Sequence, residues 1–235
     1  MQIDSGYIPE STEAVNAICD RNGDLLFYMD NTNLYDKSHK NMKGSNKNNF
    51  WYGSSSMSLI LPLPNSDSIY YIFTPEWKNN LNNRVNPTQM HYHIVNMNRN
   101  NGLGELVTAK QFLLDSTAER VTAVKHCNGK DWWVVGQNAY TEQFAVWLFS
   151  DTGISKKPLH YYSSGNIPIN DYFGLRSYMK FSPDGAFLAE SNYDTIGTKT
   201  KIFLKLHKFD PSVGRFFQSL IIQLPAPLVR DPFMG

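Results

Sequence analysis

The sequence predicts an all-β fold, a β-propeller of four-stranded antiparallel blades, and three observations support this prediction. Apolar stretches rich in Val, Ile, Tyr, Phe and Thr alternate with short polar turns rich in Asn, a pattern typical of strands joined by hairpins. A hairpin of one layout recurs four times along the chain. No segment combines sustained helical periodicity with helix caps.

Each recurrence begins with an apolar strand, a tight polar turn and a second, strongly apolar strand. The four turns lie at Asn22–Gly23, Asn65–Ser66, Asn128–Gly129 and Asp184–Gly185. Because Asn-Gly and Asp-Gly tolerate the positive φ angles of two-residue hairpin turns, three of the four are strong hairpin signals. We therefore predict an inner hairpin in each repeat, the last of them in the stretch FSPDGAFLAES at 181–191.

A third strand with alternating side chains follows three of the hairpins, and a fourth strand completes those repeats. The third strands are MHYHIVNMN (90–98), FAVWLFSD (144–151) and KIFLKLHKFD (201–210), and the fourth are VTAKQFLL, LHYYSS and QSLIIQL. The first repeat is shorter, with NLYDKS as its third strand. The second strands start 44, 63 and 55 residues apart, at Leu25, Ile69, Trp132 and Phe187. Four antiparallel strands in about 40 to 60 residues is the layout of a propeller blade.

We predict a single domain over residues 1–235 with about four blades. The blades are expected at 11–44, 56–114, 119–165 and 174–225. Residues 226–235, APLVRDPFMG, look like the approach to another first strand. We therefore expect this domain to be part of a larger propeller.

Composition and charge exclude several classes of function. With 22 Lys and Arg against 21 Asp and Glu, the formal net charge is +1, so we expect no nucleic-acid partner. No apolar run reaches the length of a membrane span, so we expect no membrane insertion. The start, MQIDSGYIPE, has neither the basic nor the apolar region of a signal peptide, and none is expected in this chain. Cys19 and Cys127 match no zinc or CxxC spacing and leave the redox compartment open.

Five stretches of the chain resemble one known family, in the family's order and over nearly the whole length. They are CDRNGDLLFYMDNTNLYDKSHKNM, SSSMSLILPLPNSDSIYYIFT, YHIVNMNRNNGLGELVTAKQFLL, AERVTAVKHCNGKDWWVV and MKFSPDGAFLAES. The chain resembles the propeller in the N-terminal parts of large Bacteroidetes surface proteins, which are described as gliding-motility-associated or as carrying a type IX secretion type B sorting domain. The last stretch is also similar to the SPDG repeat of TolB-like and WD-repeat-like propellers. The resemblance implies an extracellular or cell-surface setting and a propeller used for binding or display, with no catalytic residues to carry over.

Motifs for catalysis and for cofactor or metal binding are missing from the sequence. The chain has no GxSxG, HExxH or P-loop sequence, and GLGELV at 102–107 lacks the third glycine of a dinucleotide fingerprint. DRNGD at 20–24 has oxygen ligands but not the terminal glutamate of a calcium loop, so a turn is predicted. His91 and His93 share one strand face without a third ligand, which favours two half-exposed strand histidines over a metal site. We predict no catalytic residue, no cofactor and no metal.

We predict a non-catalytic binding or structural display module whose ligand is a protein or a glycan. The long connections at one end of a propeller carry aromatic residues, which bury much area at low entropic cost when they bind. The predicted ligand-binding aromatics are Trp51, Tyr52, Trp77 and Tyr140. Glu119 and Arg176 stand where inner strands begin and are predicted to line the central channel.

Other interpretations stay open. The aromatics would otherwise plug gaps between blades, and Glu119 and Arg176 would join neighbouring blades by a salt bridge or hydrogen bond. The adjacent Trp132 and Trp133 face opposite sides of their blade and are expected in its core. The rival functions are an intracellular WD-repeat-like scaffold and a propeller enzyme that acts on polysaccharide or peptide. The enzyme requires paired carboxylates about 5 to 10 Å apart at the channel mouth. The sequence does not decide the oligomeric state.

Overall fold

The computed structural model of the chain describes residues 15–30, 32–46, 58–77, 88–139, 141, 143–163, 178–196 and 199–224. Over these residues the chain is all-β, with fifteen strands and one short 3-10 turn at Asn100–Gly102. The predicted all-β class is confirmed. No helix in these ranges is long and apolar enough to cross a membrane.

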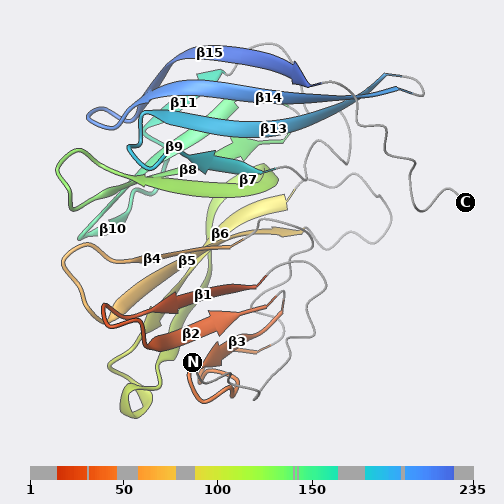
Figure 1. Cartoon of the computed structure of the whole chain (residues 1–235). Helices are drawn as coiled ribbons and strands as arrows, with labels where there is room; N and C mark the ends of the chain where they lie inside the picture. Colours follow the sequence, from red (N-terminus) through yellow and green to blue (C-terminus); the bar gives the residue numbers. More distant parts are fainter. Residues whose placement is uncertain are drawn as a thin grey trace, which may run out of the picture.

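The described strands form three antiparallel sheets. The first contains β1 (Asn16–Cys19), β2 (Leu25–Met29) and β3 (Leu34–Asp36). The second contains β4 (Leu59–Pro62), β5 (Ile69–Trp77), β6 (Thr88–Asn96), β7 (Glu105–Lys125), β8 (Trp132–Asn138), β9 (Gln143–Ser150), β10 (Gly153–Ile154) and β11 (His160–Ser163). The third contains β12 (Met179–Phe181), β13 (Phe187–Ile196), β14 (Lys199–Asp210) and β15 (Arg215–Leu224). In Figure 1 the strand groups follow one another as layers, from β1–β3 through β4–β6 and β7–β9 to β13–β15.

The strands repeat the hairpin layout that the sequence predicts. The predicted inner hairpins form as the antiparallel pairs β1–β2, β4–β5, β7–β8 and β12–β13. The predicted third and fourth strands follow as β6 and β7, β9 and β11, and β14 and β15. The strands that begin the inner hairpins lie against one another in chain order, β1 on β4, β4 on β7 and β7 on β12.

The strand β7 departs from the prediction of separate second and third blades. We expected a fourth strand of the blade at 56–114 and a first strand of the blade at 119–165. Instead, β7 runs unbroken for 21 residues, pairs with β6 up to Thr117 and with β8 from Thr117 onward, and so joins the strands of both predicted blades in one eight-stranded sheet. A register shift after Thr117 and a positive φ of 54° at Ser116 mark where the strand changes partner, as β-bulges do. The sheets formed by the described residues do not close into a ring.

The hairpin turns are longer than the predicted two-residue turns. At the first turn, the N–H of Gly23 donates to the carbonyl of Asp20 (3.1 Å), and the N–H of Asp20 donates to the carbonyl of Asp24 (2.9 Å). Gly23 has a φ of 87°, whereas Asn22 is not in the left-handed region. This is a type I turn followed by a left-handed glycine, a three-residue loop that also matches the twist of a hairpin. The side chain of Asp20 favours it, because Oδ1 accepts hydrogen bonds from the N–H groups of Asn22 (2.8 Å) and Asp24 (3.0 Å).

Apolar clusters fill the spaces between the layers. Phe27 and Ile72, both fully buried, belong to the cluster between the first sheet and the strands β5 and β6. Phe144 and Phe216 belong to the cluster between β9 and the third sheet. Trp147 is fully buried in a further cluster within the second sheet. Because both faces of the middle strands are covered, these strands are apolar on both sides rather than on alternate residues.

Substitution of two glycines with nearly equal φ angles tests how the third sheet packs on the second. Gly129 (φ 70°) has open space where a Cβ would lie, whereas a Cβ on Gly214 (φ 69°) would lie 2.7 Å from the ring of Trp133. We expect Gly129→Ala to lower the free energy of unfolding by about 1 kcal/mol through backbone strain alone. Gly214→Ala should lower it by a further 1 to 3 kcal/mol or so, because the indole must shift. Urea unfolding measures both values, and equal losses would show that β14–β15 does not rest on Trp133.

Candidate functional site

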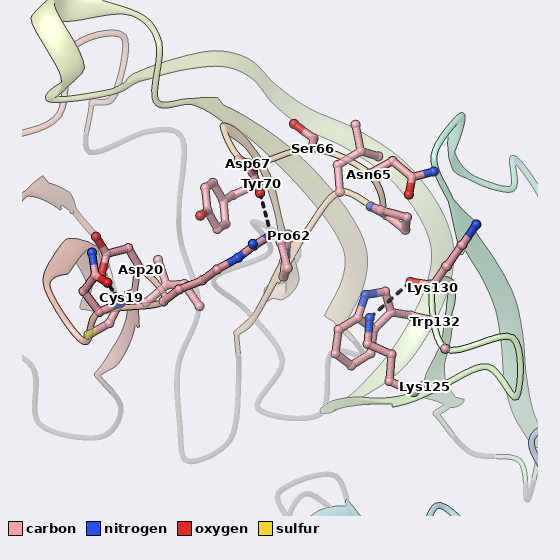
Figure 2. Close-up of a pocket in the computed structure, with 16 residues that line it drawn as sticks. Cys19, Asp20, Pro62, Asn65, Ser66, Asp67, Tyr70, Lys125, Lys130 and Trp132 are labelled. Atoms are coloured by element: carbon pink, nitrogen blue, oxygen red, sulfur yellow. Dashed lines mark hydrogen bonds and ion pairs between the residues drawn. The ribbon is translucent and has the colours of Figure 1, made fainter.

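A large open cavity lies where hairpin turns from three successive repeats meet. Its volume is about 830 Å³, and its walls come from the turn after β1, the turn after β4, and the facing ends of β7 and β8. Figure 2 shows Asp20, Asp67 and Tyr70 on one side of this turn cavity and Lys125 and Trp132 on the other. The volume falls within the range of ligand pockets in proteins, about 300 to 1,000 Å³.

An ion pair joins two of the turns at the cavity. Arg21 Nη2 lies 2.9 Å from Asp67 Oδ1, and the two side chains are 90% and 87% exposed. Fully exposed pairs contribute little to folding, about 0 to 1 kcal/mol, because water screens them. Both groups are therefore able to exchange this contact for a ligand at small energetic cost.

Tyr70 forms part of the same wall, beneath these charges. Its ring is 7% exposed and packs edge-on against Phe27, with the ring centroids 5.6 Å apart. Burial raises the pKa of the phenol above its ordinary value, and the nearby Asp67 and Asp20 carboxylates raise it further. The hydroxyl therefore stays protonated at neutral pH and is available as a hydrogen-bond donor.

Lysine and tryptophan side chains form the opposite wall. Lys125 Nζ lies 3.8 Å from the centre of the Trp132 ring, a cation–π contact, and donates to the carbonyl of Lys130 (3.1 Å). Burial lowers the pKa of Lys125, and the charge of Asp131 opposes this shift. Trp132 Nε1 is buried and has no hydrogen-bond partner among the described residues. The cavity thus has an acidic and hydroxyl-bearing side, with Arg21 at its edge, and a basic aromatic side.

Sequence reasoning placed the site elsewhere. Trp51, Tyr52, Tyr140 and Arg176 lie outside the described residues, and so does the side chain of Trp77, the last residue of β5. Glu119 lies in β7 and is 3% exposed.

The turn cavity itself went unrecognised because its residues carry the signals of ordinary hairpin turns. Two features of the sequence are unusual for an ordinary hairpin. They are the adjacent tryptophans Trp132 and Trp133, and Lys125, which lies three residues before the turn at Asn128–Gly129.

The residue beside Glu119 anchors a buried charge network between two sheets. Arg120 of β7 is 1% exposed; its Nη1 donates to Glu190 Oε2 of β13 (3.0 Å) and its Nη2 donates to Asn192 Oδ1 (3.1 Å). Lys205 Nζ lies 3.6 Å from the other carboxylate oxygen of Glu190. Arg120 thus makes a contact between neighbouring repeats of the kind that we considered for Glu119.

Glu190 holds its charge although it is buried. Burial raises its pKa, but the hydrogen bond from His207 and the charges of Arg120 and Lys205 outweigh burial and hold the pKa below its usual value. His207 Nε2 contacts Glu190 Oε1 (3.0 Å), and His207 Nδ1 contacts Ser219 Oγ (2.9 Å). Hydrolases use this order of hydroxyl, imidazole and carboxylate. Here the imidazole is fully buried, and Ser219 Oγ also lies 3.4 Å from the hydroxyl of Tyr162, so the network joins the strands β11, β13, β14 and β15.

A second buried network surrounds Glu76 at the end of β5. The N–H of Lys110 donates to His93 Nδ1 (3.3 Å), which fixes the proton of the neutral imidazole on Nε2. His93 Nε2 then donates to Glu76 Oε1 (3.0 Å), and Thr74 Oγ1 donates to the same oxygen (3.0 Å). Burial lowers the pKa of His93, consistent with this neutral form.

The expectation of two half-exposed histidines on β6 was wrong. The side chain of His93 is 0% exposed and that of His91 is 13% exposed, and both face Glu76, at 3.0 Å and 3.8 Å from its carboxylate oxygens. Within the described ranges, no group of three or more His, Cys, Asp or Glu side chains is arranged to hold a metal ion.

Comparison with protein-family models found no match, and comparison with curated proteins found none either.

The neutral state of His93 predicts how stability depends on pH. An unfolded histidine titrates near pH 6.5, whereas the folded pKa of His93 is lowered, so the unfolded chain binds more protons below that pH. We expect the free energy of unfolding to fall as the pH drops below about 6.5, by up to about 1.4 kcal/mol per pH unit for this group. In His93→Gln the slope between pH 7.5 and 5.5 should be shallower. Urea unfolding at several pH values measures this, and an unchanged slope in the variant would contradict the assignment.

Proposed function

We propose that this chain is a non-catalytic recognition module that binds its ligand in the turn cavity. The observation that carries the proposal is the cavity itself: about 830 Å³ between turns of three successive repeats, with exposed charges on both walls. Turns held by rigid strands suit recognition, because they are already ordered before the ligand binds and therefore lose little conformational entropy on binding.

We further propose that the repeated four-strand units are blades of a β-propeller. Their strand order and the contacts of β1 with β4, β4 with β7 and β7 with β12 support this proposal. In a propeller the innermost strands surround the central channel, so the turn cavity would lie at one mouth of that channel. Closure of the ring would require a further sheet against the outer face of β12–β15.

The chemistry of the cavity favours an elongated polar ligand, a glycan or an extended peptide. Asn, Asp and Arg side chains and the Tyr70 hydroxyl supply many donors and acceptors, while Pro62 and Trp132 supply apolar surface. The resemblance to bacterial surface propellers supports a secreted or cell-surface setting, where such ligands occur.

The carboxylates of the cavity do not favour the rival enzyme. Asp20 caps its own turn through two backbone N–H groups, which leaves Asp67 as the one carboxylate among the residues that line the cavity without this role. A glycosidase instead needs one carboxyl group poised as an acid and a second free as a base or nucleophile.

The proposal predicts that charge reversal on both walls weakens binding without unfolding the chain. Arg21 and Lys130 are exposed, so the double variant R21E/K130E should keep its circular dichroism spectrum. We expect a ligand found by screening arrays of bacterial surface glycans and of peptides to bind the variant at least about tenfold more weakly.

Lys157→Glu is the matched control, because Lys157 is exposed but does not line the cavity. Binding that weakens equally in the control and in R21E/K130E would place the ligand elsewhere. An array with no bound ligand at all would overturn the assignment of a recognition function to this cavity.

A further inference from the structure

A second, smaller pocket lies between the last strands of the third and fourth repeats. Its volume is about 320 Å³, at the lower end of the range of ligand pockets. Residues 159–162, at and just before the start of β11, form one side, and residues 214–216, at the start of β15, form the other. None of these residues lines the turn cavity, so this outer pocket is a separate site.

The lining residues place the outer pocket along strand edges. Successive side chains of a β-strand project to opposite faces, so a cavity on one face of a sheet touches alternate residues. The outer pocket instead touches consecutive residues of both strands. β11 pairs with β9 and β15 pairs with β14, and neither pairs with a second strand among the described residues. The pocket therefore lies along the edges of β11 and β15 that these partners leave open.

Two contacts hold the walls of the outer pocket together. The rings of Tyr162 and Phe216 pack with their centroids 5.1 Å apart. His160 Nε2 lies 3.0 Å from the carbonyl oxygen of Val213, and it donates this hydrogen bond because a carbonyl can only accept. The open edges are thus already in place before a ligand binds, which lowers the entropic cost of binding.

Exposed side chains border the open edge of β11. Leu159 and Tyr161 are 50% and 53% exposed, and because they are two residues apart on extended chain they share one face. On the β15 side, Arg215 is exposed and forms no ion pair with a described residue. The site thus combines backbone N–H and C=O groups, two apolar side chains and one unpaired cation.

We propose that the outer pocket binds an extended peptide of a partner protein, which adds as a strand to the open edge of β11 and pairs an acidic side chain with Arg215. A glycan or a small acid would also meet the charge of Arg215. Only an extended polypeptide matches the regular spacing of N–H and C=O groups along a strand edge, and such edges are sites of strand addition.

The alternation of side chains predicts the sequence pattern of the peptide. The face of β11 that carries Tyr162 is turned toward β15, as its contact with Phe216 shows. On that face the added strand places side chains in the outer pocket, toward Arg215. On the other face its side chains lie beside Leu159 and Tyr161. We therefore expect acidic and apolar residues to alternate in the peptide.

Selection from a display library of random peptides about ten residues long tests this proposal on the purified chain. An enriched peptide should show the alternating pattern and should bind Arg215→Glu at least about tenfold more weakly. Replacing its acidic residue by lysine should restore binding to that variant. Arg99→Glu is the matched control, because Arg99 is exposed in the turn between β6 and β7 and lines neither pocket. Circular dichroism confirms the fold of each variant.

Methylation of single backbone nitrogens in the selected peptide tests strand addition itself. Alternate residues of a strand direct their N–H groups to the same neighbour, so methylation at one alternating set should weaken binding and at the other set should not. Equal effects at all positions would overturn the proposed pairing with β11.

The remaining outcomes decide between the two sites. A library that yields no binding peptide, or a peptide whose binding is unchanged in both Arg215→Glu and Tyr161→Asp, would overturn the proposal. Binding that is lost in R21E/K130E but kept in Arg215→Glu would place the peptide in the turn cavity. That result would support the proposed function of the cavity while overturning the assignment of the outer pocket.

Discussion

The buried ion pair between Arg120 and Glu190 is the constraint on which the arrangement of the last two layers depends. Face-to-face stacking of sheets buries whatever lies between them, and here that includes a carboxylate and two cations that are at most 1% exposed. Such charges are tolerated only when they are paired with good geometry. Arg120 can reach Glu190 and Asn192 together in one relative placement of β7 and β13, so the network fixes that placement more specifically than apolar contacts do.

The long strand β7 connects this network to the turn cavity. Its middle holds Arg120 against the last sheet, and its end presents Lys125 beside Trp132 in the cavity wall. Because β7 pairs regularly with β8 from Val121 to Lys125, Arg120 and Lys125 are held by the same stretch of paired strand. Turns fixed in this way supply the pre-organised binding surface that the proposed function requires.

The sequence predicts the local features of this structure well. Asn-Gly and Asp-Gly turns with apolar flanks located the hairpins, since such turns act within a few residues. The type of the first turn was not predicted, because the Asp20 carboxylate stabilises a type I turn that the Asn-Gly pair alone does not indicate. The sequence did not predict that β7 is continuous. Nothing in residues 115–118 indicates that the backbone there is irregular and still lets the strand pair with both β6 and β8.

The features that depend on distant residues were not predictable. Arg120 and Glu190 are 70 residues apart, and each alone looks like an exposed strand residue. The same holds for Glu76 and His93, whose burial depends on register across two strands. The cavity is of this kind too, because it forms only where three unremarkable turns converge.

A double-mutant cycle on Arg120 and Glu190 tests the central claim most directly. Arg120→Met and Glu190→Gln should each lower the free energy of unfolding by about 3 to 5 kcal/mol, because each removes one charge from the buried network and leaves the remaining charges unbalanced. The double variant should lose clearly less than the sum of the two, which would show that the pair acts as one unit between the sheets. Additive losses, or single losses under about 1 kcal/mol, would contradict the account and leave the stacking to apolar contacts alone.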